Sequence, residues 1–119
     1  MSVTVNYFAR GAGILINGSA TPPTSVQASA LQEQVAQVNM LDTDTQALIT
    51  HNFGFDASAP TYFASPQIIG PWLQGSAQVG GTYMPAFSFD ITNTNVVKMN
   101  KVSFLGTGGT FMVTLRRPW

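Results

Sequence analysis

VAQVNMLDTDTQALITH, residues 35–51, is the stretch of this sequence that decides the fold. Small or apolar residues occupy every second position on both sides of an Asp-Thr-Asp-Thr cluster: Ala36, Val38 and Met40 before it, and Ala47, Ile49 and His51 after it. A period of two is typical of strands with one buried face, and Asp and Thr side chains hydrogen-bond to their own backbone in turns. The stretch therefore predicts a β-hairpin across Thr43-Asp44, with Val38 opposite Ile49 and Ala36 opposite His51.

The residues just before this stretch leave a second interpretation open. Residues 25–34 contain good helix formers such as Ala30, Leu31 and Glu33. A helix continued over residues 25–41 would not bring the apolar positions of the two halves onto one surface, whereas a hairpin does. We therefore expect strands on both sides of the Asp-Thr-Asp-Thr turn.

A second hairpin is predicted further along the chain. Alternate positions of residues 83–92 carry large apolar side chains that would share one face: Tyr83, Phe87, Phe89 and Ile91. Asn93-Thr94-Asn95 has turn composition, and a three-residue loop there sets Ile91 against Val97 and Phe89 against Met99. Pro85 places the start of this segment at a sheet edge or a bulge.

Glycine and proline punctuate the rest of the chain. Residues 53–82 leave room only for brief strands at 61–64 and 67–69. Gly106-Thr107-Gly108-Gly109 is a turn signal, and Phe111, Val113 and Leu115 then alternate with other residues as a final strand. Several short strands separated by such turns predict an all-β fold, an antiparallel β-sandwich or a barrel-like domain.

The first 24 residues differ from the rest. Val3, Val5 and Tyr7 sit at alternate positions, glycines follow, and Pro22-Pro23 favours an extended polyproline conformation. One interpretation is an edge strand with a loop; the other is an arm that lies on a neighbouring subunit. Our prediction is an extended N-terminal arm over residues 1–24 and a single β-sandwich domain over residues 25–119.

Composition narrows the function classes. Only 8% of residues are charged, against about 25% in ordinary soluble domains, and five basic residues balance five acidic ones. Zero net charge removes the repulsion that keeps monomers apart, which favours an assembly, and it argues against a nucleic-acid partner. The absence of cysteine excludes disulfides and thiolate metal sites. No apolar stretch is long enough to cross a membrane, and no signal peptide is expected.

Catalytic motifs are missing from the sequence. His51 is the only histidine, and no serine lies in a G-x-S-x-G context. We interpret His51 as a strand-end residue whose ring nitrogens bond to the backbone. Asp42 and Asp44 lack the remaining ligands of a calcium loop, and the glycine cluster at 106–109 lacks the lysine of a P-loop. We therefore expect a non-enzymatic protein with no catalytic residue, no metal and no cofactor.

Aromatic and arginine side chains near chain breaks are the remaining outliers, and these types dominate the energetics of protein–protein interfaces. Trp72 follows a Gly-Pro pair, and folding over the end of the sandwich is an equal alternative for it. Trp119 follows Arg-Arg-Pro and would fray unless it docks on its own domain or on a neighbour. The predicted partner-binding residues are Tyr7, Phe8, Arg10, Trp72, Arg116, Arg117 and Trp119.

Five short motifs carry a resemblance to a known class of proteins. They are Asp-Thr-Asp-Thr (42–45), Ile-Thr-His-Asn-Phe-Gly (49–54), Asn-Thr-Asn (93–95), Gly-Thr-Gly-Gly-Thr-Phe (106–111) and Leu-Arg-Arg-Pro (115–118). Together they resemble small β-rich virion structural proteins of tailed bacteriophages, of the head decoration or cement type. The resemblance spans about residues 35–119, does not cover the first 24, and brings no catalytic residue with it.

The resemblance implies a protein that decorates and stabilises a capsid by bridging major capsid subunits. It implies self-association, with a trimer favoured, and a place on the capsid surface of the virion after synthesis in the host cytoplasm. Neither nucleic acid nor a membrane is an expected partner. The alternative is a phage tail, fibre or receptor-binding β module, in which Tyr62, Trp72 and Tyr83 would stack on sugar.

Overall fold

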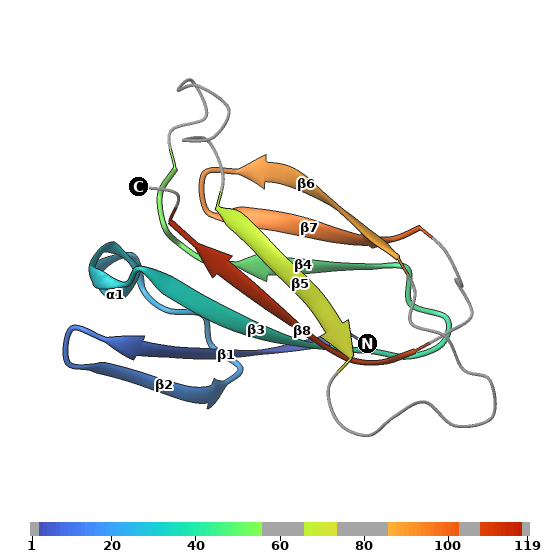
Figure 1. Ribbon diagram of the computed structural model, residues 1–119, viewed down its shortest axis with the longest axis horizontal. Helices are drawn as coiled ribbons and strands as arrows, with labels where there is room; N and C mark the ends of the chain where they lie inside the picture. Colours follow the sequence, from blue (N-terminus) through green and yellow to red (C-terminus); the bar gives the residue numbers. More distant parts are fainter. Residues whose placement is uncertain (1–2, 56–65, 74–85, 103–107, 118–119) are drawn as a thin grey trace.

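The computed structural model describes residues 3–55, 66–73, 86–102 and 108–117. Its strands form two antiparallel sheets, one of five strands and one of three, which appear as separate layers in Figure 1. The predicted all-β, sandwich-like fold is therefore confirmed.

The larger sheet has the strand order β2-β1-β3-β8-β5. Its members in chain order are β1 (Thr4–Gly11), β2 (Ile14–Ser19), β3 (Glu33–Met40), β5 (Gln67–Leu73) and β8 (Gly109–Arg116). The smaller sheet has the order β4-β7-β6. It consists of β4 (Gln46–Thr50), β6 (Phe87–Asn93) and β7 (Val96–Lys101).

One core lies between the two sheets. Buried side chains alternate along β3 and β8, where Ala36 is in register with Val113 and Val38 with Phe111. The smaller sheet contributes its own buried residues in register, Ile49 with Val97 and Ala47 with Met99. Burying each of the larger side chains among these, valine, isoleucine, phenylalanine or methionine, stabilises the fold by roughly 1.5–3 kcal/mol.

A short helix, α1 (Ser25–Ala30), precedes β3. It forms because Thr24 and Gln27 make a capping box, in which each side chain accepts a hydrogen bond from the backbone N–H of the other residue. The helix ends before Leu31, whose buried side chain joins the core. Residues 25–41 thus hold a helix and a strand in succession, and the two interpretations of this segment each apply to one half of it.

The hairpin predicted across Thr43-Asp44 is wrong, although both of its strands exist. β3 pairs with β1 and β8 in the larger sheet, whereas β4 pairs with β7 in the smaller one. The connecting turn carries the chain from one layer to the other. The apolar positions of the two strands therefore both point into the core, as predicted, but they are not paired side by side.

The extended arm predicted for residues 1–24 is also corrected. β1 pairs with β2 as a hairpin and with β3 on its other side. The alternating side chains of β1 explain this placement, since Tyr7 and Ala9 are buried in the core and Val5 packs against it. This hairpin is part of the sandwich rather than an appendage to it.

The predicted pairing of β6 with β7 is confirmed. Phe89 is in register with Met99 and Ile91 with Val97, and a bulge follows at Asn93. The alternation predicted at the end of the chain is confirmed as well, because Phe111, Val113 and Leu115 of β8 are buried. The brief strand predicted at 67–69 is the start of β5. The strand predicted at 61–64, Tyr83, and residues 106–107 of the glycine turn lie outside the described residues.

Candidate interaction surface

The face of the larger sheet that points away from the core carries a row of apolar side chains. In one line across the sheet, Phe8 is in register with Val35, Val35 with Thr114, and Thr114 with Ile69. In the next line, Met112 is in register with Trp72. We call this surface the outer face and define it by Phe8, Val35, Ile69, Trp72 and Met112.

Trp72 is the largest side chain of the outer face and is 44% exposed. Its ring lies over Gly70, where a Cβ would come within 2.8 Å of the indole and 3.1 Å of the Met112 carbonyl oxygen. Gly70 also has a φ of +99°, a conformation that favours glycine. Glycine at this position therefore leaves the space that the indole occupies over β5.

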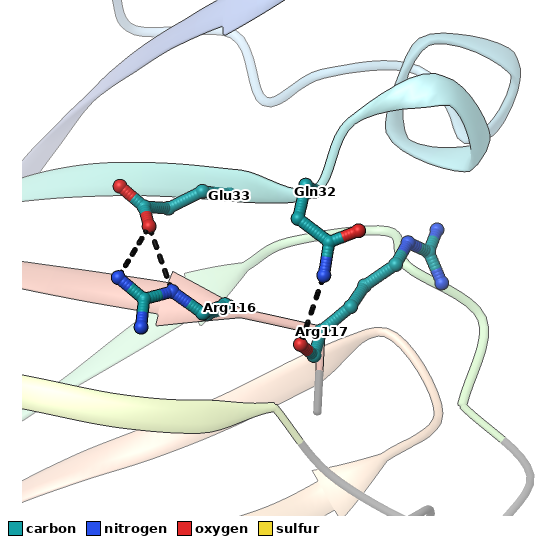
Figure 2. Close-up of polar contacts among 4 residues, drawn as sticks. All are labelled: Gln32, Glu33, Arg116 and Arg117. Atoms are coloured by element: carbon teal, nitrogen blue, oxygen red, sulfur yellow. Dashed lines mark hydrogen bonds and ion pairs between the residues drawn. The ribbon is translucent and has the colours of Figure 1, made fainter. Parts of the chain in front are cut away.

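Charged residues border the outer face at one end. Arg116 of β8 donates to Glu33 of β3 through Nε, at 2.8 Å, and its Nη2 lies 2.8 Å from the same carboxylate oxygen (Figure 2). Both side chains are a little under half exposed, so solvent screens the pair and its contribution to stability is small. Arg10 of β1 is exposed and in register with the exposed Leu15 of β2.

Arg117 has a structural position rather than a surface one. Its guanidinium donates to the carbonyl oxygens of Leu31 and Ala28, at 3.0 and 2.7 Å, and lies 4.7 Å above the ring of Phe53. Its backbone and that of Gln32 continue the β3–β8 pairing, and the Gln32 side chain donates to the Arg117 carbonyl (Figure 2). Burial lowers the pKa of Arg117. The side chain anchors the end of helix α1 to the sandwich.

Tyr7 lies in the core, which removes it from the predicted partner-binding residues. Its hydroxyl accepts a hydrogen bond from the Thr50 backbone N–H at 2.9 Å and so joins β1 to β4 across the two layers. Burial raises the pKa of the phenol. The structure thus brings Phe8, Trp72, Arg10 and Arg116 to the same side of the larger sheet, while Trp119 lies outside the described residues.

His51 is buried just beyond the end of β4. Its ring Nδ1 accepts a hydrogen bond from the Phe53 backbone N–H at 3.0 Å, and the backbone N–H of His51 donates to the Asn95 carbonyl oxygen. The predicted bond of a ring nitrogen to backbone is therefore confirmed for Nδ1. Because Nδ1 is an acceptor, the neutral ring carries its proton on Nε2, an atom without a partner among the described residues.

The surroundings of His51 keep the ring neutral. Its imidazole contacts the rings of Phe53 and Phe55, with centroids 5.2 and 5.4 Å away. Burial, and next the positive charge of Arg117, lower the pKa of His51 to about 4. Ser88 is exposed on β6 and is not among the hydrogen-bond partners of this ring.

The aspartates of the inter-sheet turn bond to backbone. Asp44 accepts from the Leu41 N–H at 2.7 Å, and Asp42 accepts from the Gly108 N–H at 2.9 Å. Burial lowers the pKa of nearby Lys101, and Asp44 and Asp42 oppose that shift. Within the described residues, no group of three or more His, Asp or Glu side chains is placed to hold a metal ion.

Sequence reasoning missed three residues of the outer face: Val35, Ile69 and Met112. Val35 and Met112 belong to strands whose alternate positions were correctly assigned to the core, so their outward direction follows from the period of two. Ile69 lies in a segment that was predicted only as a brief strand, without an assignment of its faces. What the sequence did not contain was the strand order, which places these three side chains next to Phe8 and Trp72.

Comparisons with known proteins identify no relative: the chain matches no family model, no curated protein and no solved structure. None of the described segments forms a helix of the length and apolar character needed to cross a membrane.

Proposed function

We propose that this chain is a non-enzymatic structural protein of a tailed-phage virion, which decorates the capsid and stabilises it by bridging major capsid subunits. The observation that carries the proposal is the outer face, where exposed Trp72 and Ile69 share one side of a sheet with the half-buried Phe8, Val35 and Met112 in a protein of very low charge. Exposed apolar rows with polar borders are typical of protein–protein contacts. The resemblance of the motifs in residues 35–119 to phage decoration proteins suggests that the partner is the major capsid protein.

Self-association belongs to the same proposal. Zero net charge leaves little electrostatic repulsion between copies, and a trimer at the junction of capsid subunits would present several outer faces to the shell. Sedimentation equilibrium of the purified protein measures the oligomer number directly. A protein that stays monomeric both free and on the particle contradicts the trimer.

The capsid role is tested by removing and restoring the protein. Particles stripped of it are expected to lose thermal and osmotic stability, and re-addition is expected to restore both. Quantitative mass spectrometry of virions is expected to find tens to hundreds of copies. Unchanged particle stability, or a handful of copies per virion, contradicts the decoration role.

The outer face is tested with one variant and one matched control. Trp72→Ala is expected to weaken binding to stripped particles by about 2 kcal/mol, or roughly 30-fold, as for an aromatic residue at the centre of an interface. Val26→Ala is the control, because Val26 is 81% exposed on helix α1, away from the outer face. Equal binding of the two variants to stripped particles would mean that the contact with the capsid does not involve the outer face.

The second candidate is a phage tail, fibre or receptor-binding module, for which exposed Trp72 is the favouring observation because an indole stacks on sugar rings. A glycan array separates the two candidates. Specific glycan binding that Trp72→Ala abolishes, together with a low copy number, favours the receptor-binding module.

A further inference from the structure

Among the described strands, four lie at sheet edges, and one of the four lacks the features that usually protect an edge. β5 contains Pro71 and a bulge, β6 carries the charged Asp90 and a bulge, and β2 is interrupted by Gly18 at a φ of +78°. β4, with the sequence QALIT, has no proline, glycine, charge or register shift. Proteins blunt edge strands to prevent pairing with other chains, so an open edge is a site where a strand can be added.

The register shows which backbone groups of β4 face outward. Thr45 and His51 are bonded to Lys101 and Asn95 of the neighbouring segment, at 2.8 and 2.9 Å. Bonded pairs alternate along an antiparallel ladder, so the N–H groups of Gln46 and Leu48 point away from β7. The bond from the Thr50 N–H to the Tyr7 hydroxyl confirms that direction. No described residue bonds to the outward groups of Gln46 and Leu48.

An apolar groove runs beside this edge. Its volume is about 340 Å³, and it is lined by Val3, Val5, Gln46, Ala47 and Leu48. Val5 belongs to β1 of the larger sheet and Val3 directly precedes that strand, whereas the other three belong to β4, so the groove lies where the two layers part. None of the described residues that line it is charged, which favours an uncharged occupant because a charge placed beside them would lose water without gaining a partner.

We propose that the edge of β4 binds an extended, uncharged segment of another polypeptide by strand addition. The added strand hydrogen-bonds to the backbone of Gln46 and Leu48, and its alternate aliphatic side chains enter the groove against Val5 and Ala47. In strand addition, main-chain hydrogen bonds supply the affinity. The groove selects peptides that have aliphatic side chains at alternate positions. The proposal is independent of the capsid role, because it uses the margin of the smaller sheet rather than the outer face.

The probe is a synthetic peptide of about seven residues, a usual strand length, in which valine alternates with threonine and both ends are blocked. With peptide at about ten times its Kd, amide hydrogen exchange of Gln46 and Leu48 is expected to slow by about tenfold. A matched peptide with lysine in place of valine is expected to give no protection. Equal protection by both peptides, or protection at β2 or β5 instead, overturns the proposal.

Two variants separate strand addition from loss of folding. Leu48→Pro removes an N–H that the β4–β7 ladder does not use, so the strand is retained, and peptide binding is expected to weaken by about tenfold. Ala47→Val narrows the groove and leaves the edge amides intact, and it is expected to weaken binding by a similar factor. Undiminished binding to folded Leu48→Pro and Ala47→Val overturns the proposal.

Trp72→Ala is the control that keeps the two proposals distinguishable, since it is expected to bind the peptide like the unchanged protein. The alternative occupant of the β4 edge is a second copy of this chain. Protection of Gln46 and Leu48 that rises with protein concentration in the absence of peptide would assign the edge to self-association and overturn binding of a separate segment.

Discussion

The two ends of the sandwich are held together in different ways. At the aspartate end, defined by residues 41–45, Lys101 and Gly108, carboxylates accept hydrogen bonds from backbone N–H groups, and Gly108 lies directly against the turn. At the aromatic end, defined by residues 51–55, Thr94, Asn95 and Arg117, buried rings pack together under a guanidinium. The first end depends on close backbone approach, the second on side-chain burial.

This difference predicts that the loss of side-chain volume destabilises the fold most at the aromatic end. Phe55→Ala is expected to lower the free energy of unfolding by about 3–5 kcal/mol, because Phe55 is buried and contacts both His51 and Phe53. Urea unfolding of the purified protein measures the loss. Phe55→Leu keeps most of the apolar volume and should lose much less; equal losses would mean that ring packing is not what holds this end.

Acid should loosen the aromatic end specifically. The pKa of His51 falls from 6.5 to about 4 on folding. Between these two pH values, the unfolded chain binds a proton on His51 that the folded chain does not bind. Stability is therefore full above pH 6.5 and declines as the pH falls toward 4, by about 3 kcal/mol. Unfolding midpoints measured between pH 7 and pH 4 test this.

His51→Gln is the control for the acid experiment, because glutamine does not titrate. The variant is less stable at neutral pH, since it disturbs the bond from the Phe53 N–H, but its stability should vary less over the same pH range. A pH slope that is identical in the variant and the unchanged protein would assign the acid sensitivity to other groups.

Adding a methyl group should be most harmful at the aspartate end. A Cβ at Gly108 would lie 2.6 Å from the Met40 carbonyl oxygen and 2.7 Å from the Asp42 nitrogen, both backbone atoms. Gly108→Ala is expected to cost about 2 kcal/mol, as overpacking does. Gly54→Ala at the aromatic end is the matched control: it has space but a φ of +76°, and should cost about 1 kcal/mol. Thermal unfolding ranks the two, and a reversed order breaks the comparison.

The smallest expected effect concerns the carboxylate of the turn. Asp44→Ala removes the acceptor of the Leu41 N–H and is expected to cost about 1 kcal/mol. Asp44→Asn keeps an acceptor oxygen and should recover part of that loss. Chemical denaturation of both variants gives the values, and a neutral Asp44→Ala would mean that water replaces the bond at no cost.

Strand positions and buried faces were predictable because they are local properties. The alternation of Val38 and Met40, and of Phe111 and Val113, follows from the period of a strand and survives any arrangement of sheets. The pairing of Phe89 with Met99 was also predictable. The turn at Thr94-Asn95 is so short that the following strand, β7, must pair antiparallel with β6.

The course of the connection between β3 and β4 could not be predicted from the sequence, and the reason is physical. A hairpin and a crossing between layers bury the same residues, Val38 and Ile49 among them, so apolar pattern cannot separate them. The deciding interaction is distant: Gly108 packs on the turn and donates to Asp42, a residue 66 positions away. The outer face was not predicted from the sequence for the same reason, because it depends on β3, β8 and β5 being neighbours in the sheet.

The position of β8 has a consequence for folding kinetics. It lies between β3 and β5, and Arg116 pairs with a residue 83 positions earlier in the chain. β1, β2 and β3 can assemble early, but β3 then exposes an unsatisfied side until β8 arrives. Contacts of such long sequence separation slow folding. We therefore expect the docking of β8 to limit the rate of folding, and until β8 pairs with it the free side of β3 is open to pairing with another chain.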